Sequence, residues 1–136
     1  MILTDTGPLV ALLDKDDINH TTCIAAAKRL PFSSMLTTWP CFTEAIYLLG
    51  AVGGYRYQAE LWKLRARERL VIHTSTNSEI DYMAVLMERY NDTPMDLADA
   101  SLIATAENLL MRRIFTLDSD FRIYRLRDGS VLEVLP

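Results

Sequence analysis

The sequence predicts a three-layer α/β domain in which helices cover both faces of a mostly parallel sheet. Short apolar runs alternate with longer amphipathic runs, and no repeat or linker interrupts this alternation. A helix between two strands implies a right-handed crossover, which makes neighbouring strands parallel. The 136 residues, half of them hydrophobic, are enough for one core. A single domain over residues 1–136 is therefore expected.

Five short runs have the length and apolar content of strands, and six longer runs have helical periodicity. Glycine, proline and polar clusters mark most of their ends. Pro40 fits the first turn of a helix, and Gly53-Gly54 fits the end of that helix. The expected strands are 2–4, 34–37, 70–72, 113–117 and 131–135, and the expected helices are about 7–13, 18–30, 40–52, 55–69, 78–89 and 93–111.

Composition excludes several classes of protein. The net charge of −4 gives no general attraction to nucleic acid or to anionic membranes. Cys23 and Cys41 lie in helical patterns without metal-ligand spacing, so we expect them to be buried and reduced. No run approaches the ~18 apolar residues of a membrane span, and an expected strand begins next to Met1, where a signal peptide would lie. A soluble cytoplasmic protein without membrane contact is expected.

Two acidic residues directly follow expected strands. Asp5 follows the expected strand over residues 2–4, and Asp118 follows the expected strand over residues 113–117. Ligands of parallel α/β sheets bind beyond the carboxyl ends of the strands, so both residues are candidates for a functional site. Each also has a structural explanation, because Asp5 is a favoured helix N-cap and Asp118 lies in an Asp-rich turn with Asp120.

Three more acids lie in expected helices. Glu44 shares a helix face with apolar residues such as Tyr47, which predicts a partly buried position. Asp96 fits the third helical position of a capping box that begins at Thr93. Asp99 lies beyond that box, at the head of an apolar stripe, where a charge needs a partner. Asp99 is therefore the strongest single candidate.

A cluster of these acids without matching bases predicts a divalent cation. Carboxylate oxygens are hard ligands suited to Mg²⁺ and Mn²⁺, and two such ions can activate water for phosphodiester cleavage. No Ser, Cys or His nucleophile is then required, and His20 and His73 are expected to be structural or solvated. Basic residues crowd segments 56–69 and 112–127, where they form either a rim for a polyanionic substrate or a solvated face.

Four motifs, in this order, resemble the PIN domain, a metal-dependent ribonuclease fold of bacterial toxin–antitoxin systems of the VapC type. One such motif alone is weak, but four in register over nearly the whole chain are specific. The motifs are Thr4-Asp5-Thr6, Glu44, Met-Asp-Leu-Ala-Asp-Ala at 95–100 and Thr-Leu-Asp-Ser-Asp-Phe at 116–121.

The resemblance implies an α/β/α sandwich with a sheet of about five strands, and RNA cleavage that depends on Mg²⁺ or Mn²⁺. It implies that the acids that hold the metal and act in catalysis are Asp5, Glu44, Asp99 and the more variable Asp118. Auxiliary roles fall to Asp96, Asp120, Thr6 and Thr116, and the two threonine hydroxyls would orient water or a carboxylate.

The same resemblance implies three partners: an RNA substrate, an antitoxin whose segment fills the groove, and a second copy of the chain in a homodimer. It does not identify the RNA, because loops rather than the acids select among substrates. Trp39, Tyr47, Tyr55 and Trp62 fit either a protein contact or the core.

Two other functions match parts of the sequence. A phosphoacceptor receiver domain is also a three-layer fold with Asp residues and Mg²⁺ at strand ends, but it needs a lysine at a later strand end, and no lysine follows Lys63. A PIN scaffold that binds RNA or protein without cleavage would not need the complete set of acids. The sequence favours the enzyme.

Overall fold

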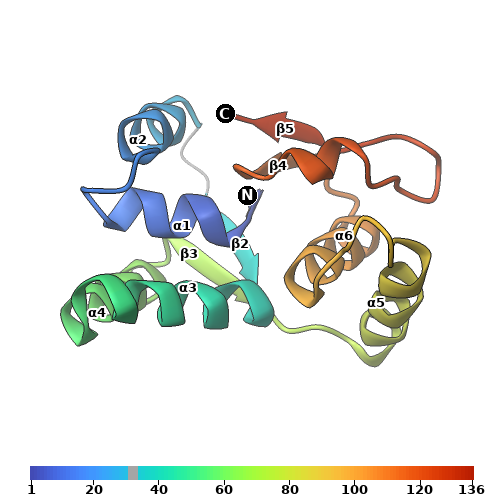
Figure 1. Cartoon of the computed structure of the whole chain (residues 1–136), viewed down its shortest axis with the longest axis horizontal. Helices are drawn as coiled ribbons and strands as arrows, with labels where there is room; N and C mark the ends of the chain where they lie inside the picture. Colours follow the sequence, from blue (N-terminus) through green and yellow to red (C-terminus); the bar gives the residue numbers. More distant parts are fainter. Residues whose placement is uncertain (31–33) are drawn as a thin grey trace.

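The computed structural model describes residues 1–30 and 34–136, and in these residues five strands form one parallel sheet covered by helices (Figure 1). The strands are β1 (Ile2–Thr4), β2 (Met35–Thr38), β3 (Leu70–His73), β4 (Arg113–Phe115) and β5 (Glu133–Leu135). The helices are α1 (Thr6–Leu13), α2 (His20–Arg29), α3 (Trp39–Gly53), α4 (Tyr55–Ala66), α5 (Asn77–Arg89) and α6 (Leu97–Leu109), with a short 3₁₀ helix η1 (Ser119–Arg122). The predicted three-layer α/β/α sandwich with a sheet of about five strands is confirmed.

Apolar cores lie on both faces of the sheet. On one face α1, α3 and α4 bury residues such as Leu9, Phe42 and Leu61, and α1 and α2 pack against β1 and β4. On the other face α5, α6 and the segment after β4 bury residues such as Leu102 and Phe121. Figure 1 shows α5 and α6 grouped on one side of the molecule, apart from α3 and α4. The sheet is thus enclosed, as parallel sheets require.

The strand order β3-β2-β1-β4-β5 creates a switch point at the centre of the sheet. From β1 the chain moves outward through β2 and β3, and it then returns to β4 on the other side of β1. Thr4 pairs with Phe115, and the Asp5 amide donates to the Phe115 carbonyl at 2.9 Å. Asp5 and Thr116 therefore follow neighbouring strands at the switch point, where ligands of such sheets bind.

The largest departure from the predicted elements is the start of α6. It begins at Leu97 rather than near Thr93, and Asp96 is its N-cap. The Asp99 amide donates to Asp96 Oδ1 at 2.8 Å, and the Asp96 amide donates to Asp99 Oδ2 at 3.3 Å. The predictions that Thr93 caps this helix and that Asp99 lies beyond the capping box were therefore wrong. The Asp96–Asp99 pair satisfies two helix-terminal amides reciprocally, which favours this start.

Smaller predictions concern cysteine, histidine and the membrane. Cys23 and Cys41 are free and buried, as expected. His73 Nε2 at the end of β3 lies 2.9 Å from Oε2 of buried Glu79 of α5, a hydrogen-bond contact that links the sheet to this helix. In the described part of the chain, no helix combines the length and apolar character needed to cross a bilayer.

Candidate active site

Acids from four distant parts of the sequence line one pocket of about 270 Å³ at the carboxyl edge of the sheet. The structure thereby brings together all four principal acids of the sequence analysis, and Asp96 with them. No Lys, Arg or His side chain is among the residues of this lining. The lining consists of Asp5, Thr6, Gly7, Glu44, Asp96, Ala98, Asp99, Leu117 and Asp118. We refer to it as the acidic pocket.

Asp5 caps α1 and also lines the acidic pocket, so a capping role does not exclude a role in a site. Its Oδ1 accepts from the Thr6 amide at 2.7 Å, and its Oδ2 accepts from the Thr116 hydroxyl at 2.7 Å. Burial raises the pKa of the Asp5 carboxyl, and the charges of Asp118 and Asp96 add to this, although the two hydrogen bonds oppose it. A carboxylate at this position is therefore held in a defined orientation but is electrostatically crowded.

Asp99 is buried, with 7% of its surface exposed, and it faces other acids across the pocket. Burial and then the neighbouring charge of Asp96 raise the pKa of Asp99 to about 7, with smaller contributions from Asp5 and Asp118. The Tyr124 hydroxyl donates to Asp99 Oδ2 at 3.2 Å. Sequence analysis missed Tyr124, because it lies outside the four motifs and in no regular element.

Glu44 lies on the rim of the acidic pocket and is exposed. The prediction that its helix face is partly buried was wrong: Tyr47 is 74% exposed, and α3 instead buries Phe42, Ala45 and Leu49. The protein around the Glu44 carboxyl still excludes part of its surrounding water, which raises its pKa, and the charges of Asp96 and Asp5 raise this pKa further. The charges of the neighbouring acids therefore affect the protonation of Glu44 although its side chain is exposed.

The residues after β4 shape the remaining wall. The Thr116 hydroxyl donates to Asp5 Oδ2, and its Oγ1 also accepts from the Asp118 amide at 3.0 Å. Asp118 Oδ1 accepts from the Asp120 amide at 2.9 Å and so caps η1. Asp120 does not line the acidic pocket. It lies in the first turn of η1, in agreement with its place in an Asp-rich turn.

Small polar groups lie behind the acids. The Thr6 hydroxyl donates to the Cys41 carbonyl at 3.3 Å, so it is engaged in the helix packing beside Asp5. The hydroxyls of Thr38 and Ser101 lie 2.6 Å apart, and Ser101 also donates to the Ala98 carbonyl at 2.7 Å. These buried contacts fasten α6 to the end of β2. The sequence signal for them is Ser101 within the largely apolar run of residues 97–106.

Within residues 1–30 and 34–136, no basic side chain forms an ion pair with an acid of the acidic pocket. The ion pairs of residues 1–30 and 34–136 involve Glu60, Glu79, Glu107, Asp128 and Glu133, and none involves a pocket acid. The exposed basic residues of segments 56–69 and 112–127 therefore form no ion pair with these acids. Burial is the main cause of the raised pKa values of Asp5, Glu44 and Asp99, and repulsion among these unpaired carboxylates adds to it.

The donor set fits a hard divalent cation held partly through water. Across the described ranges, no three His, Cys, Asp or Glu side chains form a ready-made cage for an ion. Mg²⁺ typically uses only one or two carboxylates and keeps several waters, and oxygen ligands alone suit Mg²⁺ or Mn²⁺. The crowded, unpaired acids of the pocket meet this requirement.

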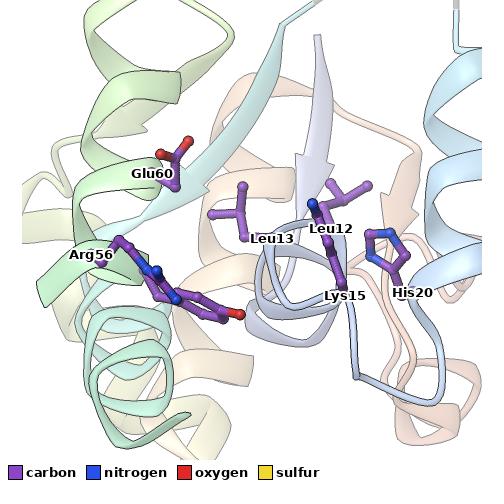
Figure 2. A pocket seen from close by; sticks show the side chains of 7 residues that line it. Leu12, Leu13, Lys15, His20, Arg56 and Glu60 are labelled. Atoms are coloured by element: carbon purple, nitrogen blue, oxygen red, sulfur yellow. The ribbon is translucent and has the colours of Figure 1, made fainter. Parts of the chain in front are cut away.

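A second hollow, of about 540 Å³, lies at the opposite end of α1. Lys15 and His20 lie on one side of it and Arg56 and Glu60 on the other, with Leu13 between them (Figure 2). Glu60 forms an ion pair with Lys63, with 2.9 Å between Oε1 and Nζ. This hollow has mixed charge and shares no residue with the acidic pocket, so its cations do not neutralise the pocket acids.

The fold and the site define an α/β/α domain with an unpaired cluster of carboxylates at the switch point of a parallel sheet. The model of the PIN domain family matches residues 2–126, and the chain belongs to this family. The resemblance inferred from the four motifs is confirmed. A comparison of the sequence with curated proteins gave no match.

Solved structures with this fold include toxins of toxin–antitoxin systems. VapC20 of Mycobacterium tuberculosis, a sarcin–ricin loop cleaving toxin, matches with a TM-score of 0.85 and 20% identity over 100% of both chains. VapBC2 of Rickettsia felis, bound to a DNA fragment from its promoter, matches with a TM-score of 0.67 and 14% identity over 100% of both chains. A toxin–antitoxin complex from Klebsiella pneumoniae matches with a TM-score of 0.65 and 20% identity, over 89% of this chain and 90% of that one.

Proposed function

We propose that this protein is a divalent-metal-dependent endoribonuclease and the toxin of a toxin–antitoxin pair. The observation that carries the proposal is the convergence of Asp5, Glu44, Asp99 and Asp118 in one pocket without a cationic partner. Membership of the PIN family and the fold shared with VapC20 support it.

In this proposal Asp5, Asp99, Asp118 and Glu44 hold Mg²⁺ or Mn²⁺, directly or through water. The bound ions would lower the pKa of a water and stabilise the leaving oxygen of a phosphodiester. Other residues of the chain orient these acids and set the charge around them. Thr116 keeps Asp5 in one orientation, and Asp96 caps α6 and adds negative charge beside Asp99.

The choice of RNA as substrate and of an antitoxin as partner rests on the relatives. VapC20 is a sarcin–ricin loop cleaving toxin, and two similar structures are toxin–antitoxin assemblies. Exposed aromatic residues of α3 and α4, which include Trp39, Tyr47, Tyr55 and Trp62, supply an apolar surface for an antitoxin or for a second copy in a homodimer. Trp39 and Trp62 both pack edge-on against Phe42, and exposed apolar residues that cluster in this way commonly mark a protein contact.

The test is RNA cleavage by purified protein with Mn²⁺, compared among wild type, Asp5→Asn, Asp99→Asn and a control, Asp81→Asn. Asp81 is exposed on α5 and outside the acidic pocket. We expect cleavage by wild type and the control, and loss with EDTA or in either pocket variant. Binding of RNA without cleavage by fresh wild type would instead identify a non-catalytic scaffold, and labelling by acetyl phosphate would identify a receiver domain.

A further inference from the structure

Tyr124 contacts an acid of the acidic pocket from a segment that lies outside the helices and strands. It follows η1, and its side chain is fully buried, with 0% of its surface exposed. Its hydroxyl donates to Asp99 Oδ2 at 3.2 Å. A buried tyrosine hydroxyl needs a partner, and here that partner is an acid of the pocket.

The two oxygens of Asp99 have different surroundings. Oδ2 accepts from both the Tyr124 hydroxyl and the Asp96 amide. Oδ1 accepts no hydrogen bond from any residue in the described ranges, and it is not among their buried unpartnered side-chain atoms. Oδ1 is therefore the oxygen that remains open to the pocket. Two donors on one oxygen restrict rotation of the carboxyl group and keep Oδ1 in that position.

The position of the tyrosine hydroxyl is itself fixed by packing. The Tyr124 ring lies edge-on to Phe121, with 5.3 Å between centroids and 85° between planes, and edge-on to Tyr90 at 5.1 Å and 65°. Its amide donates to the Asp120 carbonyl at 3.2 Å. Contacts from both η1 and the end of α5 thus place the hydroxyl.

We infer that Tyr124 is a positioning residue that holds Asp99 Oδ2 and presents Oδ1 to the metal. This inference rests on the proposed function, because it assigns a task to a carboxylate of that site. Partners that orient a ligand from behind commonly change metal affinity 10- to 100-fold when they are removed. The geometry assigns Tyr124 this role because it is the side-chain donor to Asp99 among the described residues.

The test compares Mn²⁺ affinity, measured by electron paramagnetic resonance, in wild type, Tyr124→Phe and Tyr82→Phe. Tyr82→Phe is a matched control, because its hydroxyl is buried without any hydrogen-bond partner in the described residues. Both changes remove one oxygen and keep the ring. We expect the Kd for Mn²⁺ to rise about tenfold in Tyr124→Phe and to stay unchanged in Tyr82→Phe.

A second measurement separates positioning from packing. In RNA cleavage titrated with Mn²⁺, the half-saturating concentration should rise about tenfold in Tyr124→Phe, while the rate at saturating Mn²⁺ returns close to that of wild type. A role confined to core packing would lower the melting temperature of the metal-free protein and leave the half-saturating concentration unchanged. That outcome overturns the inference.

Asp99→Asn distinguishes this inference from the proposed function. Mn²⁺ binding by wild type that is weakened in Asp99→Asn but equal to wild type in Tyr124→Phe overturns only the role of Tyr124. Absence of Mn²⁺ binding by wild type, at millimolar concentration, overturns the metal-dependent function and the inference with it.

Discussion

Replacing Asp99 with asparagine should stabilise the metal-free protein above pH 7, although Asp99 lies in the candidate active site. The substitution removes one negative charge from the acidic pocket and keeps the shape of the side chain. Asparagine can still accept a hydrogen bond from the Asp96 amide and from Tyr124, the two donors to Asp99. The change therefore tests charge crowding without removing the local hydrogen bonds.

The magnitude follows from the pKa of Asp99, which burial and Asp96 raise from an ordinary 3.8 to about 7. Between these values the folded chain keeps a proton that the unfolded chain has released. The associated stability is fully present below pH 3.8 and is lost as the pH rises through about 7. At 1.36 kcal/mol per pH unit, the interval corresponds to about 4 kcal/mol. The loss of a favourable charge at the helix N-terminus reduces the gain by about 0.5–1 kcal/mol.

The assay is urea unfolding in EDTA at pH 5 and pH 8. Wild type should lose stability between the two, and Asp99→Asn should flatten this dependence and exceed wild type at pH 8 by about 3 kcal/mol. Addition of Mn²⁺ at pH 8 should raise the melting temperature of wild type and have little effect on the variant. The control Asp81→Asn should follow wild type throughout. If wild type in EDTA were equally stable at both values, the account of crowded carboxylates would be refuted.

Two further predictions concern buried hydrogen bonds. Thr116→Val removes the hydroxyl that donates to Asp5 Oδ2, so we expect a loss of about 1.5–3 kcal/mol in urea unfolding together with slower RNA cleavage. Thr105→Val removes a hydroxyl that donates to the Ser101 carbonyl of its own helix, and it should leave cleavage unchanged. Glu79→Gln weakens the buried pair with His73 and should cost about 1–3 kcal/mol at pH 7, with normal cleavage. Hydrogen bonds from Thr76 and His73 outweigh burial and lower the pKa of Glu79, so this difference should shrink as the pH falls below the ordinary value of 4.5. A Glu79→Gln difference that persisted at pH 3 would contradict this assignment.

The order and class of the elements follow from local sequence patterns. Apolar runs of strand length, amphipathic runs of helical length, and turn residues between them depend on nearest neighbours, and they predicted the parallel sheet and its two helical layers. The same patterns correctly put Asp5 directly after β1. The prediction that Asp118 directly follows a strand over residues 113–117 was wrong, because β4 ends at Phe115 and Asp118 lies three residues beyond it.

The start of α6 was decided by competition between two local signals. Thr93 with Asp96, and Asp96 with Asp99, both have capping-box spacing. Sequence spacing alone does not decide which capping box starts the helix, because the choice depends on how the helix packs against the sheet. In the folded chain Asp99 is buried beside Asp5, and Ser101 reaches Thr38 on β2, so the helix register follows from tertiary contacts.

The identity and order of the acids, and the family they indicate, were properties of the sequence by itself. The tertiary structure alone decides which carboxylate oxygen of Asp5 and of Asp99 accepts a side-chain hydrogen bond. Thr116 reaches Asp5 across neighbouring strands, and Tyr124 reaches Asp99 from a segment after η1. Glu44 likewise turned out to lie on an exposed rim, because the fold buries the other face of α3. A hydrogen bond depends on distances of about 3 Å between residues far apart in the chain, and only packing of the whole domain sets such distances.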